Sequence, residues 1–114
     1  MDRKKELKEL YKQMKTDMGI YIIESKSNNK YYLETTQNLK GKMNSSKFQL
    51  EMGSFRNHEL QKDWKEIGSQ NFEIKILEYL EYDKDESKLD YSEELEIMKT
   101  IWEEKLSKQN KLQY

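Results

Sequence analysis

The sequence predicts a single α+β domain, a small three-stranded antiparallel sheet flanked by helices, with an extra N-terminal helix. Two runs of β-branched and aromatic residues, 20–23 and 31–36, flank a polar segment centred on Asn28-Asn29. A third run, at residues 71–82, alternates apolar and charged residues. Segments before and after these runs carry apolar residues at three- and four-residue spacings, which is the pattern of an amphipathic helix.

Composition sets the class of protein. Charged residues make up 38% of the 114 residues and hydrophobic ones 34%, but eight Tyr, two Trp and three Phe supply enough buried area to argue against disorder. The absence of cysteine excludes disulfides and thiolate metal sites. No apolar run is long enough to span a membrane, and the basic start lacks the apolar stretch of a signal peptide. We therefore expect a soluble protein of the cytoplasm.

Residues 2–15 are predicted to form the N-terminal helix, whose apolar stripe is Leu7, Leu10, Tyr11 and Met14, followed by Met18. Its other face is almost entirely Lys and Glu. Two roles remain open, a packing helix laid over the sheet and a basic arm that clamps nucleic acid. We divide the chain into this helix (1–18), a domain (19–107) and a C-terminal tail (108–114).

The first two strands are predicted to form a β-hairpin, because asparagine tolerates the positive φ that tight turns require. Alternation places Tyr21 and Ile23 on one face of the first strand, and Ile20 and Ile22 on the other. We expect Tyr21 and Tyr32 to lie at corresponding positions in the two strands.

After the hairpin, Asn38 is predicted to cap a short helix that Gly41 interrupts. Residues 45–52 form a second short element, which the pattern leaves open between strand and helix. Asn57 is predicted to cap a helix that runs to Ile67 and ends at Gly68.

Residues 71–82 are predicted to be the third strand, paired with the hairpin, and residues 83–88 a solvated loop. Asp90 is predicted to cap the last helix, with Glu93 at capping-box spacing. The predicted buried stripe of this helix is Leu95, Met98, Ile101 or Trp102, and Leu106.

Charge is distributed unevenly along the chain. Residues 19–70 carry eight Lys/Arg and six acids, whereas residues 71–104 carry four and twelve. We expect a nucleic acid to contact the first two thirds and to avoid the acidic segment. The acidic residues 78–104 also permit a protein partner.

Two triplets of the hairpin carry a family resemblance. Gly19-Ile20-Tyr21 and Tyr32-Leu33-Glu34, followed by Thr35-Thr36-Gln37-Asn38-Leu39, resemble the GIY-YIG nuclease family, with Glu34 in place of the second glycine. The helix from Asn57, the third strand and the last helix continue the likeness, which spans about three quarters of the chain. The resemblance implies a GIY-YIG-like domain and metal-dependent hydrolysis of DNA.

The resemblance also implies site residues, several of which depart from the family. Tyr21 and Tyr32 match the two motif tyrosines, while Lys42 stands where the family has a phosphate-neutralising arginine. Phe55 stands at the family's histidine, and the single histidine, His58, is expected on the surface. Lys99 stands at the metal-binding glutamate, so that Glu96, one turn earlier, is the weak candidate metal ligand.

These departures predict a domain whose nuclease site has decayed and which binds nucleic acid, and they assign it no definite cofactor. The resemblance places Glu34 beside the phosphates of a bound DNA, where its negative charge would repel them. Lys40, Lys42, Lys47 and Arg56 are the candidate phosphate contacts. The alternatives are an active endonuclease that uses Tyr21, Tyr32, Lys42 and Glu96 with Mg²⁺ or Mn²⁺, and a protein-interaction module.

Overall fold

The computed structural model describes residue 3 and residues 15–114, so the helix predicted over residues 2–15 lies outside the described residues except at Arg3 and Lys15. The strands are β1 (Met18–Ser25), β2 (Lys30–Thr36), β3 (Phe72–Leu80) and β4 (Leu112–Gln113). The helices are α2 (Leu39–Met52), α3 (His58–Ile67) and α4 (Ser92–Lys108), and a 3₁₀ turn at Ser69–Asn71 leads into β3. The α+β fold class is confirmed.

The sheet has the order β3-β1-β2-β4. As predicted, β1 pairs antiparallel with β2 and with β3. The fourth strand corrects the prediction of three, because Leu112 and Gln113 pair in parallel with Lys30 and Tyr31 of β2. Two residues are too few to show an alternating pattern, so the sequence could not reveal this strand.

The hairpin forms as predicted, but its register differs. Asn29 takes a φ of 60°, which confirms that an asparagine closes the turn. Tyr32 lies opposite Ile23, and Tyr21 lies opposite Glu34. The expectation that the two tyrosines correspond was wrong by two residues, because the strands pair about a point between Ser27 and Asn28, whereas that correspondence requires a point between Lys26 and Ser27.

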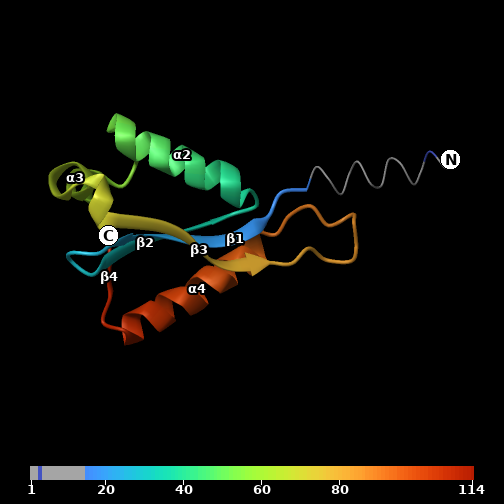
Figure 1. Ribbon diagram of the computed structural model, residues 1–114. Coiled ribbons are helices and arrows are strands. Elements are labelled where there is room, and N and C mark those ends of the chain that lie inside the picture. Colours follow the sequence, from blue (N-terminus) through green and yellow to red (C-terminus); the bar gives the residue numbers. More distant parts are fainter. Residues whose placement is uncertain (1–2, 4–14) are drawn as a thin grey trace.

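The two faces of the sheet have separate cores, as alternation predicted. Tyr21 and Ile23 face the helices α2 and α3, where they pack in one cluster with Leu39, Leu50, Phe55, Leu60, Trp64 and Phe72. Ile20 and Ile22 face α4 and pack with Tyr31, Leu33, Met98 and Leu106. Figure 1 shows α2 and α3 on one side of the sheet and α4 on the other. The side chain of Tyr21 therefore belongs to the α2 and α3 side.

The helix α2 is longer than predicted. The side chain of Asn38 caps it as expected, by accepting a hydrogen bond from the backbone N–H of Gly41. Gly41 does not interrupt the helix, because it lies within the capped first turn, where a Cβ would come within 2.5 Å of the Asn38 amide. Residues 45–52 continue the same helix and bury Ser46 and Leu50, while Phe48 and Met52 are 63% and 67% exposed.

The helix α3 follows the prediction, with Asn57 as its N-cap, Leu60 and Trp64 buried, and Gly68 at its end. The start of α4 differs. Asp90 accepts hydrogen bonds from the N–H and hydroxyl of Ser92, and no side chain caps the helix, so the predicted capping box does not form. Leu95, Met98 and Leu106 are buried in α4 as predicted, Trp102 is partly buried, and Ile101 is 46% exposed.

Candidate functional site at the tyrosine face of the sheet

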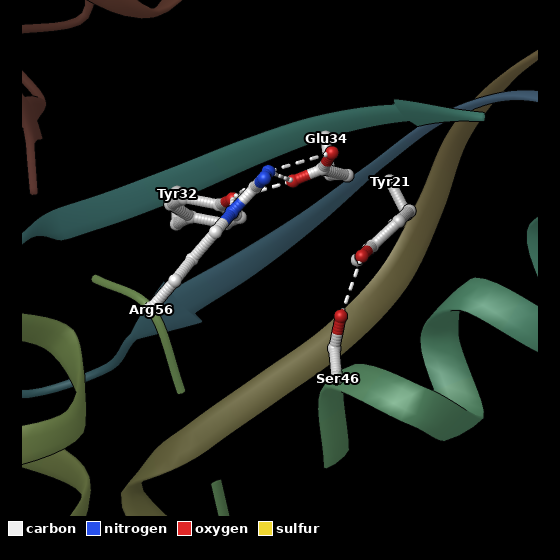
Figure 2. Close-up of polar contacts among 5 residues, drawn as sticks. All are labelled: Tyr21, Tyr32, Glu34, Ser46 and Arg56. Atoms are coloured by element: carbon white, nitrogen blue, oxygen red, sulfur yellow. Dashed lines mark hydrogen bonds and ion pairs between the residues drawn. The ribbon is translucent and has the colours of Figure 1, made fainter. Parts of the chain in front are cut away.

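Tyr21 lies in the centre of the sheet and is completely buried. Its hydroxyl forms a 2.6 Å hydrogen bond with the Ser46 hydroxyl, which α2 brings down onto the sheet. Figure 2 shows the two side chains pointing toward each other. Burial raises the pKa of Tyr21, and the hydrogen bond to Ser46 opposes this only in part. The Tyr21 hydroxyl is therefore neutral and already bonded within the protein.

Tyr32, Glu34 and Arg56 form a second polar group on the same side of the sheet (Figure 2). Tyr32 and Glu34 are two residues apart in β2 and therefore share a face. The Tyr32 hydroxyl donates to the Glu34 carboxylate. Arg56, in the segment before α3, donates from Nη2 to both carboxylate oxygens at 2.7 and 3.0 Å and to the Tyr32 hydroxyl at 2.9 Å. We call these three residues the arginine cluster.

The arginine cluster packs against the core through Tyr32, and its own contacts set the protonation states of Tyr32 and Arg56. The ring of Tyr32 meets Phe55 edge to face, with centroids 5.3 Å apart. Burial, followed by donation to Glu34, raises the pKa of Tyr32. Hydrogen bonds to Tyr32 and Glu34 raise the pKa of Arg56. At neutral pH Tyr32 is thus protonated and Arg56 is charged.

The lysines of α2 lie differently. Lys40, Lys42 and Lys47 are exposed, and none makes an ion pair with another residue of the described chain. Lys42 lies one helical turn before Ser46, the partner of Tyr21. These lysines are free to contact an anion.

Two hollows lie between α2 and the edge strand β3. One, of about 690 Å³, is lined by Lys40, Met43 and Ile76, among others. The other, of about 410 Å³, is lined by Lys47, Trp64 and Phe72, among others. Because both share Met43 and Asn44, the two hollows adjoin along α2. Lys40 and Lys47 therefore each line a concave part of the protein surface.

The candidate metal ligand lies apart from the tyrosines. Glu96 is exposed on α4, which covers the opposite face of the sheet. Lys99 and Glu103 of the same helix line a hollow of about 160 Å³ together with Tyr32 and Tyr114. Within residues 15–114 and at residue 3, no three His, Cys, Asp or Glu side chains gather where they would hold a metal ion.

Two further motif positions lie close to the start of α3. Phe55 is buried beneath Tyr32, and His58 is exposed at the start of α3.

No helix in the described part of the chain is long and apolar enough to cross a membrane.

Comparison with solved structures decides the fold. The catalytic domain of the homing endonuclease I-TevI aligns with a TM-score of 0.64 and 27% identity, over 84% of this chain and 96% of that domain. A mutant of the catalytic domain of the intron endonuclease I-TevI aligns with a TM-score of 0.63 and 25% identity, over 85% of this chain and 91% of that one.

This chain has the GIY-YIG fold. The resemblance carried by its two hairpin triplets is confirmed at the level of structure. No family model and no curated protein sequence matches the chain.

Two features of this GIY-YIG domain were not foreseen from the sequence. The bond between Tyr21 and Ser46 joins residues 25 positions apart, and no local pattern marks Ser46. The approach of Tyr32 and Glu34 could have been found from strand alternation. Their pairing with Arg56 could not, because it depends on where the segment before α3 lies against β2.

Proposed function

We propose that this GIY-YIG domain binds nucleic acid, most directly DNA, without cleaving it, because its nuclease site has decayed. One observation carries the proposal. The hydroxyls of Tyr21 and Tyr32 are bonded within the protein, whereas the lysines of the neighbouring helix α2 are exposed and form no ion pair with the described part of the chain. The hydroxyls that would do chemistry are engaged, and the α2 lysines that would hold phosphate are free.

The loss of catalysis rests on the chemistry of the missing groups. Hydrolysis of a phosphodiester needs an accessible base or water-orienting group, a cation at the phosphate and a carboxylate that fixes the metal. Tyr21 is buried, Lys42 replaces the family's arginine, and Lys99 replaces its glutamate. Each transition-state contact of this kind typically contributes about 2.7–4 kcal/mol, so their combined loss would remove detectable turnover.

The proposed binding of DNA rests on the charge of α2 and on the two aligned structures. The two aligned structures are described as catalytic domains of an endonuclease, a class of enzyme that acts on nucleic acid. In this chain α2 carries Lys40, Lys42 and Lys47 against one acid, Glu51. Neutralising phosphates releases counterions from DNA, so such a surface binds without a metal and weakens steeply as salt rises.

The first test is the affinity for a short fluorescent DNA duplex, measured by anisotropy over a series of salt concentrations. Replacing Lys40, Lys42 and Lys47 by Gln should weaken binding and flatten the log–log salt slope by roughly 2 to 3, since each lost phosphate contact changes it by about 0.9. The matched control replaces Lys84, Lys105 and Lys108 by Gln, which changes the net charge equally away from α2. Equal weakening in both triple variants would contradict a binding surface on α2.

The second test is the nicking of supercoiled plasmid with Mg²⁺ and with Mn²⁺. We expect none above an EDTA control. Metal-dependent nicking that disappears in Tyr21→Phe would overturn the decayed site and support the active endonuclease. A folded protein that neither nicks nor binds DNA would instead point to the protein-interaction module.

A further inference from the structure

Arg56 is the most exposed member of the arginine cluster. Its side chain is 68% exposed, whereas that of Glu34 is 16% exposed. One guanidinium nitrogen, Nη2, donates to both oxygens of the Glu34 carboxylate, and a guanidinium donates equally well to the oxygens of a phosphate. Glu34 therefore presents to Arg56 the same chemistry that a nucleic-acid backbone would present.

We propose that Arg56 is a phosphodiester-binding residue of this domain, and that Glu34 is its intramolecular competitor. Nucleic acid binds by replacing the Glu34 carboxylate on the guanidinium. This proposal deepens the proposed function and rests on it.

The geometry permits the exchange. Nε of Arg56 donates to Tyr32, Nη2 donates to Tyr32 and Glu34, and Nη1 donates to none of the described residues. An incoming phosphate can therefore engage Arg56 before Glu34 leaves. Because the Arg56 side chain is mostly exposed, water or phosphate can solvate its guanidinium once it leaves Glu34.

Glu34 also keeps a partner when Arg56 turns away. The Tyr32 hydroxyl donates to the same carboxylate, so that the largely buried Glu34 is not left unpaired. Tyr32 in turn is held by its edge-to-face contact with Phe55. Glu34 and Tyr32 form the fixed half of the cluster, and Arg56 the half that can exchange.

The test is a double-mutant cycle in the full chain, with affinity for the same DNA duplex as the readout. Glu34→Gln keeps the shape of the side chain and removes its charge, and should tighten binding by roughly threefold to tenfold. Arg56→Gln should weaken binding and flatten the salt slope by about 0.9. In the Arg56→Gln background, Glu34→Gln should bring no gain, because the residue that it releases is gone.

Glu59→Gln is the matched control. Glu59 pairs with Lys30, so this variant changes the net charge equally and also breaks an ion pair, here between α3 and β2. It should leave the affinity unchanged. An equal gain from Glu34→Gln with and without Arg56, or from Glu59→Gln, would overturn the proposal and indicate a general charge effect.

A measurement on the unmodified chain keeps the proposal testable if Glu34→Gln fails to fold. The sequence contains two arginines, Arg3 and Arg56, so the Nε–H signal of Arg56 in an NMR spectrum is identified by its loss in Arg56→Gln. Adding DNA should shift this signal. An unshifted Arg56 signal at saturating DNA would overturn the proposal.

The outcomes separate the two proposals. Salt-dependent binding by the unmodified chain without coupling between Glu34 and Arg56 overturns this inference alone. No binding by any variant overturns the proposed function and the inference with it. Arg56-dependent binding that appears only in Glu34→Gln supports the competitor and shows that the unmodified domain is held in a non-binding form.

Discussion

At the scale of single residues, the contact between Tyr21 and Ser46 shows how packing can redirect a family motif. Tyr21 retains the motif identity, yet its hydroxyl is enclosed beneath α2 and bonded to Ser46. A buried hydroxyl without a partner costs free energy, so each of these two residues stabilises the other. The pair therefore acts as a link between the sheet and α2.

We expect Tyr21→Phe and Ser46→Ala each to lower the free energy of unfolding by about 1–3 kcal/mol. Ser46→Ala should cost more, because it strands the Tyr21 hydroxyl, whereas a stranded Ser46 can bond to a carbonyl of its own helix. The double variant should cost less than the sum of the two. Urea unfolding followed by circular dichroism measures all three, and strictly additive costs would contradict the link.

At the scale of elements, the close approach of β1 to β3 explains why the first triplet begins with a glycine, Gly19. Gly19 has a φ of 157° and lies against β3, where a Cβ would come within 2.1 Å of the backbone oxygen of Glu78. The register between β1 and β3 shifts directly after Ile20. A side chain at residue 19 would thus separate the two strands at this irregularity.

Gly19→Ala is expected to lower the free energy of unfolding by about 3 kcal/mol, because backbone cannot move aside as a flexible side chain can. Gly53→Ala is the matched control. Gly53 also has a positive φ, of 77°, but nothing lies within 4 Å of its Cβ position, so the cost should be only about 1 kcal/mol. Denaturant midpoints distinguish the two, and equal costs would show that the contact with β3 is unimportant.

The C-terminal segment adds a second link at this scale. Tyr114 donates a backbone hydrogen bond to the Tyr31 carbonyl at 2.9 Å, and its hydroxyl donates to Asp63 of α3 at 2.8 Å. Asn28 at the hairpin turn donates to the same carboxylate. The end of the chain thereby joins the hairpin to α3 beside Tyr32.

At the scale of the whole molecule, three tyrosines share one electrostatic property. They are Tyr21 in β1, Tyr32 in β2 and Tyr114 after β4. Burial raises the pKa of Tyr21 and of Tyr32, and burial followed by donation to Asp63 raises the pKa of Tyr114 to about 12. An unfolded tyrosine has a pKa of about 10. The native state therefore keeps these protons at a pH where the unfolded state has lost them.

The stability that these tyrosines contribute should accordingly be fully present below about pH 10. It should fall as the pH rises above 10, because the unfolded state then binds fewer protons than the native state. Tyr21 alone should contribute a slope of about 1.4 kcal/mol per pH unit. Urea midpoints measured across this range provide the test. Tyr114→Phe should make the fall shallower, whereas Tyr79→Phe, at an exposed site, should match the unmodified chain. A stability that is flat to pH 12 would contradict the burial of these hydroxyls.

The sequence by itself determined the local parts of this protein. Alternation placed Tyr21 and Ile23 on one face of the sheet, Asn29 closed the hairpin, and Asn57 and Gly68 bounded α3, because periodicity, turn and cap signals act within a few residues. The hairpin triplets also indicated the fold.

Only the tertiary structure decided which residues meet. It paired Glu34 with Arg56 and Tyr21 with Ser46, set the tyrosines two residues out of register, and added β4 to the sheet. Each of these depends on contacts between segments far apart in the chain, for which no local spacing carries a signal. The candidate site is made of such contacts, so the sequence could name most of its residues but not the bonds among them.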